Sequence, residues 1–110
     1  MLEIVPDDAD TWNGKGISLD YLTKYEEAIK CFDKAIELKP NSDDAWYNKG
    51  LAHDYMGKYG EALTDYDKAI GINPDNAVAW YGKSITLRKV GEHEKAEECL
   101  KKAIELGLKL

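Results

Sequence analysis

The sequence predicts an all-α protein built as a row of similar helix pairs. The tryptophans Trp12, Trp46 and Trp80 are spaced 34 residues apart, and each has a proline six residues before it. A fixed period of this length is typical of repeat architectures, in which each unit buries its apolar face against its neighbours. Within the units, apolar residues recur at helical spacing and do not alternate as in a strand. The 110 residues therefore hold about the three units that such an array needs.

Residues 1–8 align with the ends of the later units, because Leu2 to Pro6 match residues 36–40. We interpret them as the tail of a preceding partial repeat. Two origins are open, a fragment cut from a longer array or a natural start with a vestigial repeat, and we favour the fragment.

The first unit, residues 9–42, is predicted to begin with a helix over residues 9–22. Asp8 precedes this helix, and its carboxylate can accept hydrogen bonds from the free amide groups of the first turn. Ser42 and Asn76 occupy the equivalent positions, so every unit begins after a residue suited to cap a helix.

The second helix of the first unit is predicted over residues 24–38. Thr23 and Glu26 have the spacing of a capping box. In this motif each of the two side chains accepts a hydrogen bond from the backbone amide of the other residue. Pro40 ends the helix, because proline disfavours helical backbone in the residue before it. The apolar stripe of this helix is Ala28, Ile29, Phe32, Ala35 and Ile36.

The second and third units, residues 43–76 and 77–110, repeat this plan. Gly57 and Gly91 fall in the turns between helices, where glycine tolerates positive φ. We expect helices over residues 43–56, 58–72, 77–90 and 92–106. Small residues recur where the helices must approach closely, at Gly16, Gly50, Ser84, Ala28, Ala62 and Ala96.

The two cysteines, Cys31 and Cys99, lie two full periods apart. Two stacked units would separate them by more than the ~7 Å between Cα atoms that a disulfide tolerates. We therefore expect free thiols in a reducing compartment, and hence a cytoplasmic protein.

The formal net charge of −6 argues against a general surface for nucleic acid or anionic membrane, which needs clustered Lys and Arg. No apolar run approaches the ~20 residues of a membrane span. The N-terminus has neither the basic start nor the apolar stretch of a signal peptide. We expect neither nucleic acid nor membrane as a partner.

Motifs for chemistry are not found. The sequence has no Gly-rich phosphate loop, no nucleophile elbow and no zinc-type Cys/His spacing. The best metal-like cluster is Glu92, His93, Glu94, Glu97 and Cys99, which we interpret as an acidic helix surface, because a structural site usually needs four well-placed ligands. We predict no catalytic residues, no cofactor and no metal, so the protein is not expected to be an enzyme.

The repeated motif resembles the tetratricopeptide repeat (TPR), a helix–turn–helix unit of 34 residues. The first two units match its pattern at Trp12, Gly16, Ala28, Phe32, Ala35 and Pro40, and at Trp46, Gly50, Ala62, Tyr66, Ala69 and Pro74. The third unit keeps Trp80, Ala96 and Ala103. The family leucine is replaced by Lys15, Lys49 and Lys83, whose stems can cover apolar surface, and the family tyrosine by Leu19, His53 and Leu87. We expect these departures to repack side chains locally and to leave the fold unchanged.

The resemblance implies an α-α superhelix of antiparallel helix pairs, a TPR solenoid with a right-handed twist. It also implies recognition of a peptide or protein segment in a concave groove lined by the first helix of each unit. The groove positions that the family pattern assigns are Asp10, Asn13, Gly14, Ile17, Asp20 and Tyr21, then Asp44, Tyr47, Asn48, Leu51, Asp54 and Tyr55, then Val78, Tyr81, Gly82, Ile85, Arg88 and Lys89.

The charges among these positions suggest the chemistry of a partner. Four aspartates belong to the first two units, whereas Arg88 and Lys89 belong to the third. We hypothesise a peptide that is basic along one end and has an acidic group near Arg88 and Lys89. The alternative hypothesis is a structural segment that self-associates into a homo-oligomer through uncapped ends of the array.

One subclass of the family binds the C-terminal carboxylate of chaperone tails with lysine, arginine and asparagine side chains. Of these only the asparagine of the second unit is present, as Asn48, and the other positions hold Asn13, Ile17, Val78 and Gly82. A carboxylate would have no charge-assisted partner there, so we do not expect a chaperone tail as the ligand.

Overall fold

The computed structural model describes residues 8–109, and this range folds into six helices. They are α1 (Ala9–Tyr21), α2 (Tyr25–Leu38), α3 (Asp43–Tyr55), α4 (Tyr59–Ile72), α5 (Ala77–Lys89) and α6 (His93–Glu105). The predicted all-α class is confirmed, and every helix end lies within one residue of its predicted place. The partial repeat predicted over residues 1–8 lies outside the described residues, except for Asp8.

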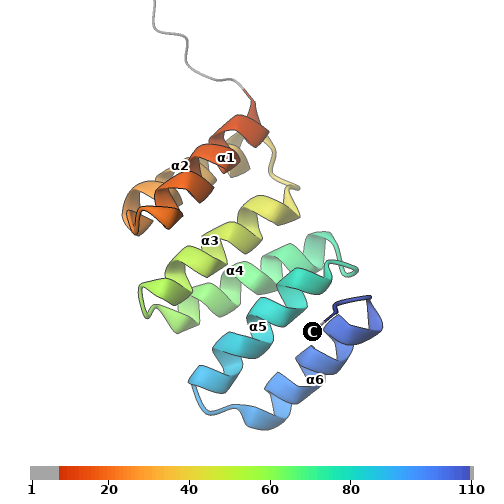
Figure 1. Ribbon diagram of the computed structural model, residues 1–110. Helices are drawn as coiled ribbons and strands as arrows, with labels where there is room; N and C mark the ends of the chain where they lie inside the picture. The colour runs from red at the N-terminus through yellow and green to blue at the C-terminus, as the bar shows by residue number, and fades with distance from the viewer. Residues whose placement is uncertain (1–7, 110) are drawn as a thin grey trace, which may run out of the picture.

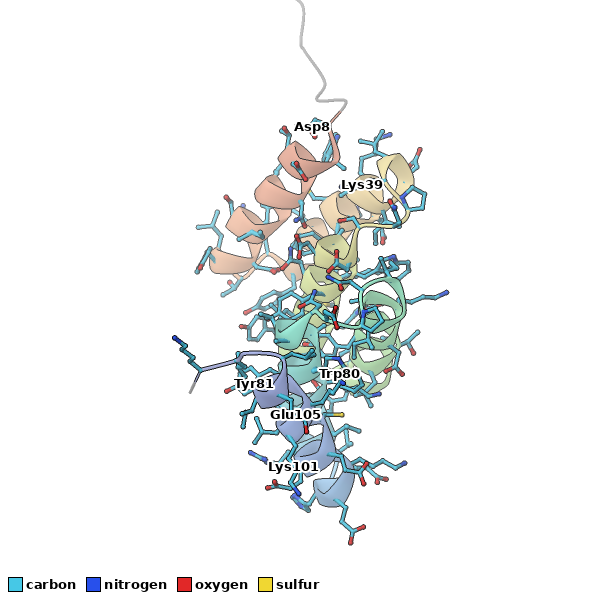
Figure 2. The ribbon with its side chains drawn as sticks, turned by 90° about the vertical axis from the view of Figure 1, so that its right-hand side faces the viewer. Asp8, Lys39, Trp80, Tyr81, Lys101 and Glu105 are labelled. Atoms are coloured by element: carbon cyan, nitrogen blue, oxygen red, sulfur yellow. The ribbon has the colours of Figure 1, made fainter. Side chains whose placement is uncertain are left out.

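The helices form three antiparallel pairs that stack along one axis (Figure 1). The array measures 55 × 25 × 22 Å, and Figure 2 shows Asp8 near one end and Lys101 near the other. Helix α1 contacts α3, and α3 contacts α5, whereas α2, α4 and α6 make no such contacts with one another within residues 8–109. The first helices of the pairs are therefore the more closely spaced row and line the inner side of the array.

The first helix of each pair begins at a side-chain cap, as predicted. The carboxylate of Asp8 accepts a hydrogen bond from the amide of Asp10 at 3.0 Å. Ser42 Oγ and Asn76 Oδ1 accept from amides three residues later, at 3.3 and 3.0 Å. These bonds satisfy amide groups that the first turn of a helix leaves free.

The capping box predicted at Thr23 is wrong. The N-cap of α2 is Lys24, which makes no side-chain cap bond, and Thr23 Oγ1 instead donates to the carbonyl of Leu22 at 2.6 Å. Thr23 has φ +58°, and the glycines at the equivalent positions, Gly57 and Gly91, have φ +78° and +88°. All three residues end the preceding helix in the left-handed conformation, so Thr23 belongs to the end of α1 and not to the start of α2.

Small residues allow the two helices of each pair to pack closely. Ala28, Ala62 and Ala96 are fully buried. A Cβ atom at Gly50 would lie 2.7 Å from Cε1 of Tyr66, which is closer than carbon atoms can approach. The aromatic ring of α4 therefore packs directly on the backbone of α3.

The cysteines belong to this packing. Cys31 and Cys99 are both buried and free, and burial raises the pKa of both thiols. Within residues 8–109, none of the helices has the length and apolar character that crossing a bilayer would require.

Candidate functional site

The predicted partner-binding residues all lie on the three helices of the inner side. They are Asp10, Asn13 and Ile17 on α1, Asp44, Tyr47, Asn48, Leu51, Asp54 and Tyr55 on α3, and Tyr81, Ile85, Arg88 and Lys89 on α5. The structure brings some of them together and binds others into internal contacts, so they do not form one uniform surface.

A cleft of ≈ 420 Å³ lies between α1 and α3. Its lining residues are Ile17, Asp20, Tyr21, Thr23, Tyr25, Asn48, Leu51 and Tyr55. We call it the α1–α3 cleft. The tyrosines give it an aromatic wall: Tyr21 is 86% exposed, Tyr55 is 59% exposed, and the Tyr55 ring lies 5.5 Å from that of Tyr25.

Two lining residues, Thr23 and Tyr25, are absent from the groove positions that the family resemblance implies. They belong to the turn and to the first position of α2, whereas the family pattern assigns groove positions to the first helices alone. The spacing of Tyr25 and Tyr59 by one repeat period is the available signal, because it places a tyrosine at the same end of the first two pairs.

A hydrogen bond joins the first two units beside the α1–α3 cleft. Asn48 Nδ2 donates to Asn13 Oδ1 at 2.9 Å, and both side chains are half-buried. This bond joins α1 to α3 and orients the amide of Asn48 beside the α1–α3 cleft.

Tyr47 has packing contacts in addition to its place on the inner side. Its ring lies 5.9 Å from that of Tyr66, and a Cβ atom at Gly82 would lie 3.2 Å from its Cε1. Burial raises the pKa of Tyr47 to about 12. Truncating Tyr47 would therefore disturb the contact between α3 and α5 as well as any ligand.

Negative charge gathers at the first two units. Partial burial raises the pKa of Asp44, and the nearby carboxylates of Asp43 and Asp10 raise it further. Burial also raises the pKa of Asp20 to about 6. Within residues 8–109, the buried oxygen Asp20 Oδ1 has no hydrogen-bond partner. A carboxylate in this condition is poorly stabilised in its charged form.

Asp54 and Lys89 were predicted to offer opposite charges to a ligand, but in the structure they bind each other. Lys89 Nζ donates to Asp54 Oδ1 at 2.6 Å, and Thr86 Oγ1 donates to Asp54 Oδ2 at 2.5 Å. Asp54 is only 6% exposed. The remaining predicted cation at this end, Arg88, is exposed, and its Nη2 atom lies 4.0 Å from Oε1 of Glu97.

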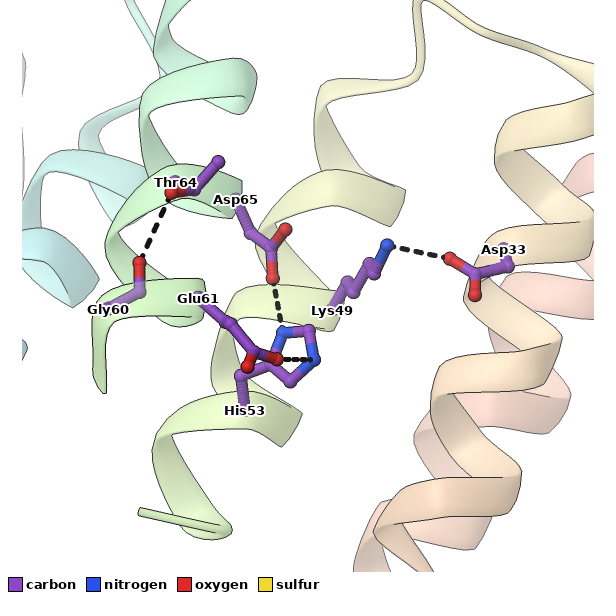
Figure 3. Close-up of polar contacts among 7 residues, drawn as sticks. All are labelled: Asp33, Lys49, His53, Gly60, Glu61, Thr64 and Asp65. Carbon is purple, nitrogen blue, oxygen red and sulfur yellow. Dashed lines mark hydrogen bonds and ion pairs between the residues drawn. The ribbon is translucent and has the colours of Figure 1, made fainter. Parts of the chain in front are cut away.

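A second polar cluster lies between α3 and α4 (Figure 3). His53 Nδ1 lies 2.6 Å from Asp65 Oδ2, and His53 Nε2 lies 3.1 Å from Glu61 Oε2. Burial raises the pKa of Asp65, and the hydrogen bond and charge of His53 oppose that shift. His53 and Asp65 are both buried, and the cluster joins the two helices of the second pair.

The lysines that replace the family leucine cover the tryptophans. The ammonium groups of Lys15, Lys49 and Lys83 lie 5.3, 5.2 and 5.8 Å from the ring centroids of Trp12, Trp46 and Trp80. Two of them also pair with the preceding unit, Lys49 with Asp33 at 2.8 Å (Figure 3) and Lys83 with Asp67 at 2.7 Å. Across residues 8–109, no three His, Cys, Asp or Glu side chains are grouped so that they could hold a metal ion.

Comparisons with protein families agree with the repeat architecture. Residues 43–76 and residues 65–98 each match a family model described as tetratricopeptide repeat, and residues 22–54 match one described as TPR repeat. Together the three matches run from residue 22 to residue 98. A comparison with curated protein sequences found no match.

Solved structures with the same fold include a crystal structure of MamA, with a TM-score of 0.84 and 28% sequence identity. The match covers 91% of this chain and 58% of the MamA chain, so this chain spans little more than half of that relative. The first TPR of Spaghetti (RPAP3), bound to the HSP90 peptide SRMEEVD, has a TM-score of 0.88 at 21% identity, covering 97% of this chain and 85% of that one. The second TPR of the same protein, with the same peptide, has a TM-score of 0.86 at 22% identity, covering 90% and 92%.

Proposed function

Because this chain belongs to the tetratricopeptide repeat family, we propose that it binds a peptide or a segment of another protein in the groove lined by α1, α3 and α5. The α1–α3 cleft is the observation on which this proposal rests. Its exposed tyrosines offer rigid contact area with a polar end, which is common in surfaces that recognise proteins.

The solved relatives support the kind of function and not the ligand. RPAP3 domains of this fold have been seen with the bound peptide SRMEEVD, which contains three acidic residues and ends in aspartate. The groove of this chain differs in charge, because Asn13, Val78 and Gly82 stand where the resemblance requires cations, and Ile17 stands where it requires an asparagine. We therefore propose a ligand other than an acidic chaperone tail.

A peptide-display selection on the immobilised chain tests the proposal. Peptides that bind the wild type are expected to lose at least about tenfold in affinity on Ile17→Lys, which puts a positive charge on an exposed apolar side chain of the α1–α3 cleft. The matched control is Lys101→Ala on α6, an exposed position away from the groove that should leave binding unchanged (Figure 2).

Tyr47 is a poor choice for this experiment, since its ring packs on Tyr66 and its loss would also disturb the contact between α3 and α5. Peptides that bind wild type and Ile17→Lys equally well, and that shift the amide NMR signals of α2, α4 or α6 instead, would assign the binding surface to another face of the array.

Self-association is the second candidate function. The observation that favours it is Ile104, a large apolar residue that is 48% exposed on α6, a helix that contacts α5 alone among the described helices. If α6 mediates association, the mass measured by light scattering will rise with concentration in the wild type and stay at that of a monomer in Ile104→Glu. A wild-type mass that stays monomeric at all concentrations would exclude this candidate.

A further inference from the structure

The second and third units show how this array neutralises an aspartate on its inner side. Asp54 receives a hydrogen bond from the Thr86 hydroxyl and an ion pair from Lys89 at 2.6 Å. The ammonium group of Lys89 also lies 5.8 Å from the ring centroid of Tyr59. A lysine between a carboxylate and an aromatic face gains both a charge-assisted hydrogen bond and a cation–π contact.

The first and second units repeat the acidic and aromatic parts of this arrangement but not its donors. Asp20 and Tyr25 stand one repeat period before Asp54 and Tyr59. The position of Thr86 is taken by Ala52, and the position of Lys89 by Tyr55, neither of which can supply a cation. Asp20 Oδ1 accordingly has no hydrogen-bond partner in the described part of the chain.

The place where Lys89 would have its counterpart is the α1–α3 cleft. Asp20, Tyr25 and Tyr55 all line it, and none of its lining side chains carries a positive charge. The exposed rings of Tyr21 and Tyr55 and the side chain of Ile17 can pack along the methylene stem of a long side chain that enters from solvent. The volume of ≈ 420 Å³ exceeds what one lysine side chain fills.

We propose that the α1–α3 cleft takes a lysine side chain of the protein partner, whose ammonium group donates to the carboxylate of Asp20. The partner thus supplies at the first interface what Lys89 supplies at the second. This inference rests on the proposed function and deepens it, because it assigns one side chain of the ligand to one cleft of the groove.

Two small probes test the assignment without knowledge of the partner. N-acetyl-lysine methylamide and its uncharged counterpart N-acetyl-norleucine methylamide are titrated to tens of millimolar against the whole chain, with amide and tyrosine NMR signals as the readout. The lysine probe is expected to shift signals of Tyr21, Tyr25 and Tyr55, and the norleucine probe is expected to leave them in place. Equal shifts with both probes, or no shift with the lysine probe, would overturn the proposal.

Asp20→Asn keeps the shape of the side chain and removes its charge. This variant is expected to bind the lysine probe at least about tenfold more weakly than the wild type, because the charge-assisted hydrogen bond is lost. Glu26→Gln removes an exposed charge next to Tyr25 on α2, outside the cleft, and is expected to change affinity by less than about twofold, since exposed charges are screened by salt. Equal weakening by both variants would reduce the effect to general electrostatics and contradict a specific site.

A third comparison fills the cleft from within. Tyr55→Lys puts an ammonium group at the position that corresponds to Lys89. This group is expected to occupy Asp20 and to lower the affinity for the lysine probe at least about tenfold. Tyr55→Met has a stem of similar reach without a charge and is expected to retain binding within about threefold. Loss of the probe in both variants would show that the ring of Tyr55, and not the charge of Asp20, holds the ligand.

The inference and the proposed function can fail separately. Display-selected peptides that depend on Ile17 but contain no enriched lysine, and that bind Asp20→Asn as well as wild type, would leave the groove as the binding surface and remove the lysine site. A lysine probe that binds at Asp20 while no peptide binds the groove would establish the lysine site and overturn the proposed peptide-binding function.

Discussion

Asp20, Asp54 and Arg88 stand at the same position of successive units, yet each has a different electrostatic role. Asp54 is buried and paired with Lys89, Arg88 is exposed near Glu97, and Asp20 has one buried oxygen without a donor. The residue type alone does not decide between these states, because the donors come from the following unit. At the scale of single residues, the neighbours at one repeat period determine what an aspartate does.

Asp20→Asn is expected to raise the free energy of unfolding at pH 7 by up to about 1 kcal/mol, after allowance for solvent screening of a half-buried group. Burial raises the pKa of Asp20 in the folded chain to about 6 from its ordinary 3.8, so the folded state holds this proton more tightly than the unfolded state. The resulting stabilisation is complete below about pH 4 and is lost as the pH rises through about 6.

Urea unfolding of wild type and variant between pH 4 and pH 8 checks this prediction. The gain from the substitution should grow as the pH rises and level off above about pH 7. The other titratable side chains that line the cleft are the phenols of Tyr21, Tyr25 and Tyr55. A difference between wild type and variant that does not change with pH would contradict an ionised Asp20 as its cause.

At the scale of helices, the contact between the two members of a pair depends on the absence of a side chain. Gly50 of α3 faces the ring of Tyr66 on α4, and Gly16 of α1 faces the ring of Phe32 on α2. The helix ends are also alike, since α1, α3 and α5 each stop at a residue with positive φ. These features determine how near the helices lie and where the chain reverses.

Gly50→Ala is expected to lower the free energy of unfolding by about 1–3 kcal/mol, because the new Cβ atom would overlap the Tyr66 ring. Gly60→Ala on α4 is the matched control, since a Cβ atom there would meet no atom within 4 Å. That control is expected to stabilise the protein by about 0.5–1 kcal/mol, the usual gain for alanine in a helix. Chemical denaturation measures both, and a stabilising Gly50→Ala would contradict the packing described here.

Thr23→Gly is expected to raise the free energy of unfolding by about 0.5–1 kcal/mol. A β-branched residue at φ +58° is strained, and glycine is not. The gain is expected despite the greater flexibility of glycine in the unfolded chain. The reverse change, Gly57→Thr, should cost a similar amount at the equivalent turn. Thermal unfolding of the two variants tests the pair, and a destabilising Thr23→Gly would show that the Thr23 side chain has a structural role beyond its bond to Leu22.

At the scale of the whole molecule, stability is the sum of the units and of the contacts between successive units. Helix α2 packs on α3 and α4 packs on α5, and each of these junctions carries the same ion pair, Lys49–Asp33 and Lys83–Asp67. The lysines that depart from the family pattern therefore join neighbouring units while they cover the tryptophans.

A double-mutant cycle of Lys49→Met and Asp33→Asn is expected to give a coupling energy of about 0.2–1 kcal/mol, because the pair is short but Asp33 is half-exposed. The same cycle at Lys83 and Asp67 should agree within about 0.5 kcal/mol, since the geometry repeats. Urea unfolding provides the free energies of unfolding for the cycle. Zero coupling at both junctions would show that these ion pairs do not stabilise the contact between units.

Much of the architecture was determined by the sequence alone. The period of the tryptophans and prolines defined the repeated pair, helical apolar spacing identified the helices, and cap residues, prolines and turn glycines placed every helix end within one residue. These features depend on residues close together in the chain, so local rules suffice. These rules also placed the turn at Thr23, but the capping box predicted there was wrong, because Thr23 has the left-handed backbone of a helix end and its side chain donates to Leu22.

The tertiary structure alone decided which charges are available to a ligand. Asp54 bonds Lys89, 35 residues away, and His53 bonds Asp65, 12 residues away, so neither pair can be recognised from adjacent sequence. The same stacking brings Asp20 to a cleft without a cation from the described chain. The physical reason is that a charge is satisfied by whatever side chain the neighbouring helix presents, and that depends on the register in which the units stack.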